Sequence, residues 1–142
     1  MIDIVLDTNV LIASLLRPNS SIMRALRAII GDPVSFVICY SSIMLAEYND
    51  VLSRPVITGR GLRDEAEKLM VILEEAGEEI IPKPVYALVY PDRSDRPFLE
   101  AAVYVDGILL TNNLRDFPFA GVNVMAPDEF LEWLARRSRT RK

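Results

Sequence analysis

The chain has no histidine and only one cysteine among its 142 residues. The absence of histidine excludes Ser-His-Asp and Cys-His catalytic systems and histidine general bases. A lone Cys39 excludes an internal disulfide and a zinc site built from several thiolates, and its setting in "SFVICY" indicates a small buried side chain. Any catalysis by this chain must therefore use carboxylates, hydroxyls, lysine or a metal ion held by oxygen ligands.

No uncharged run is long enough to span a membrane. The longest covers residues 33–46, and serines interrupt it. Asp3 and Asp7 fall where the apolar segment of a signal peptide would lie. Apolar residues nevertheless make up 51% of the chain, enough for one domain with a substantial core. We expect a soluble, intracellular, cytoplasmic protein that does not associate with membranes.

The net charge of −4 is unevenly distributed along the chain. The last eight residues, "ARRSRTRK", hold five of the 16 basic residues and no acid, which leaves 11 basic against 20 acidic residues, or −9, in the rest. The basic end is either a solvated, frayed terminus or a contact to nucleic-acid phosphates. We therefore expect one domain over residues 1–136, followed by a basic tail over residues 137–142.

Hydrophobic periodicity predicts strands that alternate with helices. Strands are expected over residues 2–6, 35–39, 78–82, 108–111 and 123–126. Helices are expected over residues 10–16, 20–30, 43–52, 62–76, 95–106 and 128–136, with a loop over 58–61. Asn19 or Ser20 would cap the second helix, and Ser41 or Ser42 the third. This alternation predicts an α/β fold with a central parallel sheet of four to five strands and helices on both faces.

Several acids fall at the expected ligand-binding edge of this sheet. Ligands of open parallel sheets bind beyond the carboxyl ends of the strands, where the strand order reverses. Asp7 ends the first strand, Asn113 and Asp116 follow the fourth, and Asp95 opens the helix before it. Each has a simpler interpretation. Asp7 and Asp95 could be helix N-caps, and Asp116, like Asp92, could be a turn residue.

Glu47 is harder to explain without a ligand. Ile43 and Val51 lie on its helical face, and neighbouring apolar residues line that face too (Met44, Tyr48 and Leu52). An unpaired carboxylate in such a stripe would cost several kcal/mol, so it needs a cation, either a metal ion or an arginine supplied by the fold. Convergence of these acids without histidine or cysteine favours Mg²⁺ or Mn²⁺ and phosphoryl chemistry.

Five stretches resemble the PIN-domain family in their order and spacing. They are "VLDTNVLIASLL", "SSIMLAEYNDVLSRP", "SDRPFLEAAV", "ILLTNNLRDFP" and the C-terminal "VNVMAPDEFLEWL". The resemblance covers nearly the whole chain and is closest to toxin-like PIN proteins of prokaryotic toxin–antitoxin pairs. It implies a three-layer α/β sandwich, a Mg²⁺- or Mn²⁺-dependent endoribonuclease that hydrolyses RNA, a homodimer and an antitoxin partner.

The resemblance also implies roles for individual residues. The metal acids would be Asp7, Glu47 and Asp95, with Thr8 or Asn9 orienting Asp7.

The loop after the fourth strand departs from the family pattern. Thr111 would order this loop, and many family members have an Asp two residues after that threonine. Here the position is Asn113, so Asp116 would have to supply the missing negative charge.

Arginines around the acids could contact RNA phosphates in spite of the acidic body. These candidates are Arg93, Arg96 and Arg115 near the acids and Arg137 and Arg139 in the tail.

Two other functions remain open from the sequence. A phosphoacceptor signalling domain would need a lysine at a late strand end, and Lys68, Lys83 and Lys142 do not fall there. A catalytically weak or inactive PIN-like protein that binds RNA or acts as a scaffold is compatible with Asn113.

Overall fold

The structure is a computed structural model, and it describes residues 1–85, 93–118 and 121–140, without the side chain of residue 140. The turn expected at Asp92 and the last two basic residues, Arg141 and Lys142, lie outside the described residues.

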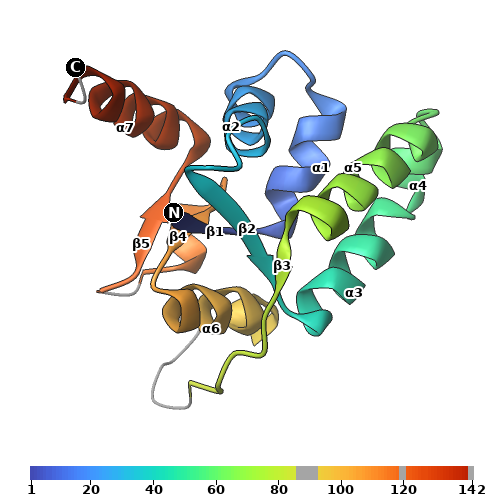
Figure 1. The fold of residues 1–142 in the computed structure, drawn as a ribbon. Helices are drawn as coiled ribbons and strands as arrows, with labels where there is room; N and C mark the ends of the chain where they lie inside the picture. Colours follow the sequence, from blue (N-terminus) through green and yellow to red (C-terminus); the bar gives the residue numbers. More distant parts are fainter. Residues whose placement is uncertain (86–92, 119–120, 141–142) are drawn as a thin grey trace.

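The core of the fold is a sheet of five strands, all paired in parallel (Figure 1). They are β1 (Ile2–Leu6), β2 (Phe36–Tyr40), β3 (Glu78–Glu79), β4 (Ile108–Leu110) and β5 (Asn123–Met125). The strand order is β3-β2-β1-β4-β5, so the chain builds outward from β1 on one side and then continues on the other through β4. The order therefore reverses between β1 and β4, which is where ligands bind in open parallel sheets.

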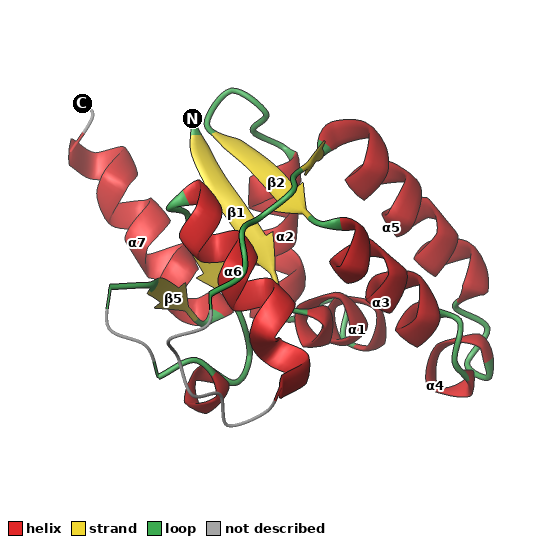
Figure 2. Cartoon of the chain, turned by 90° about the horizontal axis from the view of Figure 1, so that it is seen from below, coloured by secondary structure: helices red, strands yellow, loops and turns green. Residues whose placement is uncertain are grey.

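Helices cover both faces of this sheet. They are α1 (Thr8–Leu16), α2 (Ser21–Ile30), α3 (Ser42–Leu52), α4 (Pro55–Thr58), α5 (Arg63–Ala76), α6 (Arg96–Val105) and α7 (Pro127–Thr140), with short 3₁₀ turns η1 (Arg93–Asp95) and η2 (Leu114–Asp116). Figures 1 and 2 show α2 and α7 on one face and α6 on the other, with α3 and α5 side by side beyond β2 and β3. The predicted three-layer α/β architecture is confirmed.

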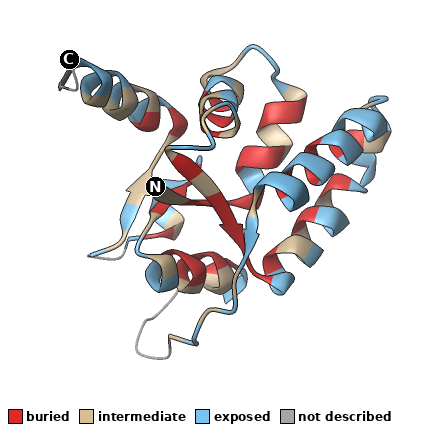
Figure 3. Ribbon diagram, in the orientation of Figure 1, coloured by how far each residue is buried: buried red, intermediate tan, exposed pale blue. Residues whose placement is uncertain are grey.

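The sheet centre and the inner faces of the helices form one apolar core. Ile4, Val5 and Leu6 of β1 are 0% exposed, as are Leu109 and Leu110 of β4. Figure 3 shows this burial along the inner strands, whereas the outer faces of α3 and α5 are largely exposed. The continuous apolar runs in the sequence are therefore strands buried on both faces.

Serine side chains begin two of the helices that surround the sheet. The Ser20 hydroxyl accepts a hydrogen bond from the Met23 amide at the start of α2, at 3.5 Å. The Ser41 hydroxyl accepts one from the Met44 amide at the start of α3, at 3.3 Å. Of the two capping candidates at each helix, Ser20 and Ser41 are the ones used.

Two elements differ from the predictions for the middle of the chain. A short helix, α4, includes Thr58, where a loop was expected, because Pro55 occupies a first-turn position in which its missing N–H costs little. The strand expected over residues 78–82 is only the two-residue β3, whose residues are exposed. Among the described residues, β3 pairs only with β2 and forms one edge of the sheet, so a long strand would leave unpaired backbone groups in solvent.

The C-terminal helix extends beyond its predicted end. α7 continues to Thr140, so Arg137 and Arg139 belong to a helix and not to an unstructured tail. The guanidinium carbon of Arg137 lies 5.3 Å from the centroid of the Trp133 ring, a cation–π contact across one helical turn. Trp133 in turn lies near Phe36 and Phe130, which join α7 to β2. The basic tail expected from residue 137 therefore begins as part of α7, with Arg137 packed on Trp133.

Among the described residues, no helix combines the length and the apolar character needed to cross a membrane.

Candidate metal centre

Asp7 lies at the point where the strand order reverses. Its backbone N–H donates to the Leu110 carbonyl at 3.0 Å, so the pairing of β1 with β4 continues to Asp7. Its carboxylate accepts a 2.7 Å hydrogen bond from the Thr111 hydroxyl, which follows β4. Asp7 occupies the N-cap position of α1 but makes no side-chain capping bond. The structure therefore gives no support to a simple capping role for this residue.

The environment of Asp7 disfavours its negative charge. Burial is the largest effect and raises the pKa of the carboxyl group above its ordinary value of 3.8, and the charges of Glu47 and Asp116 raise it further. The Thr111 hydroxyl and the Thr8 backbone amide act in the opposite direction without cancelling that rise. A buried carboxylate that two other acids repel is stabilised when a cation lies between them.

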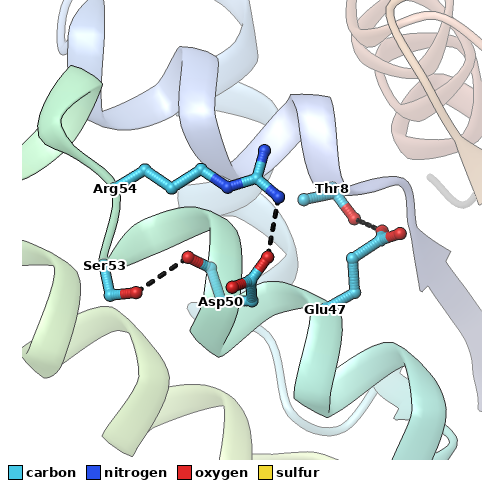
Figure 4. A network of polar contacts seen from close by, with 5 residues as sticks. All are labelled: Thr8, Glu47, Asp50, Ser53 and Arg54. Atoms are coloured by element: carbon cyan, nitrogen blue, oxygen red, sulfur yellow. Dashed lines mark hydrogen bonds and ion pairs between the residues drawn. The ribbon is translucent and has the colours of Figure 1, made fainter.

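Glu47 is held by Thr8. The Thr8 hydroxyl donates a hydrogen bond to the Glu47 carboxylate, and Figure 4 shows these side chains pointing toward each other from the start of α1 and from α3. The resemblance implied that Thr8 or Asn9 orients Asp7. The Thr8 backbone amide bonds to the Asp7 carboxyl group, whereas the Thr8 side chain binds Glu47, and Asn9 is exposed. The physical reason is that α1 already begins at Thr8, whose side chain therefore lies on the first helical turn facing α3.

The expected apolar surroundings of Glu47 are only partly present. The buried residues of α3 are Met44, Tyr48 and Leu52, whereas Ile43 is 66% exposed. The buried face is thus turned by one residue from the predicted stripe, and Glu47 lies half-buried at its edge.

The structure also bears on the alternative that an arginine neutralises Glu47. Arg54, just beyond α3, pairs with Asp50 at 2.7 Å, as Figure 4 shows. In the part of the chain that the structure describes, no lysine or arginine forms an ion pair with Glu47.

The loop after β4 brings Asp116 toward Asp7. The Asn113 backbone N–H donates to the Thr111 hydroxyl at 3.0 Å, and the Asn113 side-chain amide donates to the Asp116 carboxylate at 2.8 Å. Asp116 lies within η2, close enough for its charge to raise the pKa of Asp7. Thr111 and Asn113 therefore connect the two acids through a continuous chain of hydrogen bonds.

Asp95 stands at the N-terminus of α6 and is 9% exposed. As with Asp7, its side chain makes no capping hydrogen bond to the helix that it precedes. The acids whose charges raise the pKa of Asp7 are Glu47 and Asp116.

The oxygen donors around Asp7 fit a hard divalent cation. Within the described ranges, no three acidic or cysteine side chains are gathered closely enough to form a complete protein cage for a metal ion. Magnesium does not need such a cage, because it usually keeps several water ligands and binds one or two carboxylates together with substrate phosphates. Asp7, Glu47 and Asp116 offer only oxygen ligands, which suit Mg²⁺ or Mn²⁺.

The predicted RNA-binding arginines fall into two groups. Arg93 and Arg115 are exposed in η1 and η2, the same short turns that carry Asp95 and Asp116. Arg96 forms an ion pair with Glu100 at 3.4 Å.

The second group, Arg137 and Arg139, lies in the last turns of α7 and not in the segments that carry the acids. Arg139 is exposed, whereas Arg137 is partly covered.

The Tyr48 hydroxyl has a role that the sequence pattern did not predict. Tyr48 was expected in an apolar stripe, but its hydroxyl donates a buried 2.5 Å hydrogen bond to the carbonyl of Leu6, immediately before Asp7. The available signal was a phenol directly after Glu47 on a face shared with Met44 and Leu52. A buried tyrosine hydroxyl needs a hydrogen-bond partner.

Solved structures with this fold include toxin–antitoxin complexes. VapBC2 from Rickettsia felis, bound to a DNA fragment from their promoter, matches with a TM-score of 0.59 and 17% identity over 87% of this chain and 98% of that chain. VapBC-1 from nontypeable Haemophilus influenzae has a TM-score of 0.55 and 16% identity over 89% and 98%. FitAB bound to an IR36 DNA fragment has a TM-score of 0.55 and 19% identity over 87% and 94%. At such identities, the likeness establishes the fold alone.

Comparison of the sequence itself identifies the family. No curated protein sequence matches this chain. A family model described as PIN domain matches residues 3–115, a segment that contains Asp7, Glu47, Asp95 and Asn113 and ends one residue before Asp116. The match covers well over half of the chain and agrees with the motifs at the ends of the strands. The chain therefore belongs to the PIN-domain family.

Proposed function

We propose that this chain is a metal-dependent endoribonuclease that hydrolyses RNA phosphodiester bonds. PIN-domain proteins are generally nucleases, and the observation that carries the proposal here is the environment of Asp7. This residue is 4% exposed, and its carboxylate is bound by Thr111 at the reversal of strand order and is repelled by the charges of Glu47 and Asp116. Without a cation, the repulsion among Asp7, Glu47 and Asp116 would destabilise the fold. A divalent cation would remove that repulsion and needs several such carboxylates as ligands.

Mg²⁺ or Mn²⁺ would be held by Asp7, Glu47, Asp95 and Asp116, with the Asn113 side chain as a further oxygen ligand. Such an ion, when bound, activates water and neutralises charge on a scissile phosphate. The chain supplies the orientation of the ligands, because Thr111 holds Asp7 and Thr8 holds Glu47. The Thr111 hydroxyl binds Asp7 as a donor, so it favours the ionised form of this carboxyl group that a metal ion requires.

RNA would approach the acids along η1 and η2. The exposed Arg93 and Arg115 would contact phosphates beside the acids, and Arg96 would contribute while paired with Glu100. Arg137 and Arg139 on α7 would extend the basic surface. Positive side chains are needed there because the chain has a net charge of −4 and would otherwise repel a polyanion.

We further propose that the protein is a toxin-like PIN nuclease of the cytoplasm, a homodimer that also binds an antitoxin. The shared fold with VapBC2, VapBC-1 and FitAB over at least 87% of this chain supports this assignment. An apolar groove of about 640 Å³ lies between α2 and α5 and is lined by Leu26, Ile30, Leu69 and Ile72. An amphipathic antitoxin segment would find a matching surface in this groove.

Cleavage of a panel of end-labelled RNAs tests the proposal. We expect cleavage in Mg²⁺ or Mn²⁺ that stops with EDTA and resumes when the metal is restored. Cleavage that persists unchanged in EDTA would contradict a metal-dependent mechanism.

A catalytically weak or inactive RNA-binding or scaffold protein is the alternative. Two observations favour it: Asn113 replaces an acid at the loop, and the described residues contain no group of three close metal-ligating side chains. The same assay separates the two functions, because the alternative predicts retention of RNA on filters without metal-dependent cleavage.

A further inference from the structure

Tyr48 connects the elements that carry Asp7, Glu47 and Asp95. It is 0% exposed and lies on α3 directly after Glu47. Its hydroxyl donates a 2.5 Å hydrogen bond to the carbonyl of Leu6, the last residue of β1. Its ring lies 6.3 Å from the ring of Phe98 on α6, centroid to centroid, with an interplanar angle of 43°.

Each contact lies beside one of the acids. Leu6 immediately precedes Asp7, and Phe98 lies one helical turn after Asp95. A single buried side chain thus joins the end of β1, the middle of α3 and the first turns of α6. Glu47 itself is attached to Thr8, the residue that follows Asp7 at the start of α1.

The chemistry of the hydroxyl suits a fixed spacer. The Tyr48 phenol is the donor in this contact, and the Leu6 carbonyl is the acceptor. The Leu6 carbonyl lies in the dry interior, where water cannot replace this donor without opening the core.

We propose that Tyr48 is a positioning residue that sets the spacing of Asp7, Glu47 and Asp95 for metal binding through its contacts to Leu6 and Phe98. This inference rests on the proposed metal-dependent function. Tyr48 itself touches neither metal nor substrate, and it acts through the backbone that carries the acids. Partners of this kind, one shell outside the ligands, change metal affinity when they are mutated.

The test is Tyr48→Phe, which keeps the ring packing against Phe98 and removes only the hydroxyl. The matched control is Tyr40→Phe, because Tyr40 is also buried and its hydroxyl also binds a backbone carbonyl, that of Glu74 at 3.4 Å. Mn²⁺ binding to the metal-free proteins is measured from the electron paramagnetic resonance signal of free Mn²⁺. We expect Tyr48→Phe to weaken Mn²⁺ binding by about 10- to 100-fold, the range for residues that orient metal ligands. Tyr40→Phe should bind Mn²⁺ like the wild type.

Melting temperature in EDTA separates positioning from general stability. If both tyrosine variants melt lower in EDTA while only Tyr48→Phe loses Mn²⁺ affinity, the positioning role is supported. If Tyr48→Phe binds Mn²⁺ as tightly as the wild type does, the inference is overturned, and Tyr48 serves the core alone. Should Tyr48→Phe not fold, Phe98→Leu provides the second variant, because it removes the aromatic contact near Asp95 and should also weaken Mn²⁺ binding. Unchanged binding in Phe98→Leu would likewise overturn the inference.

Failure of the inference can be distinguished from failure of the proposed function. If the wild type binds Mn²⁺ and Asp7→Asn does not, the metal site stands whatever Tyr48→Phe does. If the wild type binds no Mn²⁺, both proposals are overturned.

Discussion

Asp7→Asn tests the metal site at its most buried acid. Asparagine keeps the size of the side chain and an oxygen that accepts from Thr111, so the fold should remain intact. The change removes a charge that is 4% exposed and that Glu47 and Asp116 both repel. It also removes a negative metal ligand. We therefore expect loss of cleavage together with a gain in stability in metal-free buffer.

The gain follows from the raised pKa of Asp7 in the folded state. Each unit by which the fold raises this pKa costs the ionised native state about 1.4 kcal/mol at pH 7. The rise is what remains after the Thr111 hydrogen bond has acted in the opposite direction, so the loss of that bond's charge dependence is already included. For a domain of this size, each kcal/mol gained raises the melting temperature by roughly 2–4 °C.

The gain should depend on pH in a definite direction. Because the pKa of Asp7 is raised above 3.8 in the folded state, protonated Asp7 favours folding. That contribution to wild-type stability is complete below pH 3.8 and is lost as the pH rises through the folded pKa. The advantage of Asp7→Asn should therefore be largest at neutral pH and should shrink in acid.

Thermal melts in EDTA and in Mn²⁺, between pH 4 and pH 8, provide the assay. At a Mn²⁺ concentration of about 100 times its dissociation constant, the wild type should gain about 2.7 kcal/mol, and the variant much less. A variant that cleaves RNA at the wild-type rate in Mg²⁺ would refute the reasoning. So would a wild-type melting temperature that does not respond to Mn²⁺.

Two further predictions concern Glu47 and the C-terminal helix. Glu47→Gln should lose cleavage and most of the Mn²⁺-induced rise in melting temperature. It should not lose stability in EDTA, because glutamine can still accept a hydrogen bond from Thr8 and no longer repels Asp7. A drop of several degrees in the melting temperature in EDTA would show that this acid is structural. Arg136 and Arg139 are both exposed on α7, and the test replaces both with glutamine in an inactive Asp7→Asn variant. The slope of the logarithm of the RNA-binding constant against the logarithm of the salt concentration should become shallower by about 1.4, at ~0.7 for each lost contact to single-stranded phosphate. Equal slopes would show that α7 does not contact RNA. Glutamine variants are more informative here than truncation, since truncation would also remove the packing of Arg137 on Trp133.

The sequence alone determined the architecture and placed Asp7 at the edge of the sheet. The apolar runs of β1, β2 and β4 are buried on both faces, so their composition specifies strands of a parallel sheet without reference to their neighbours. Asp7 could be identified because a carboxylate at the end of such a strand must reach the sheet edge.

Element ends were less predictable. The start of α4 depends on Pro55. The short length of β3 depends on its edge position in the sheet. The extension of α7 depends on the contact between Arg137 and Trp133.

Only the tertiary structure decided how the candidate site is held together. The sequence offered two overlapping stripes on α3, one through Ile43 and Glu47 and one through Met44 and Tyr48, and packing against α1, α5 and α6 selected the second. The bonds from Thr111 to Asp7 and from Tyr48 to Leu6 join residues 104 and 42 positions apart. No local pattern encodes such pairs, because they arise when parallel strands and the helices between them bring distant residues to one edge of the sheet.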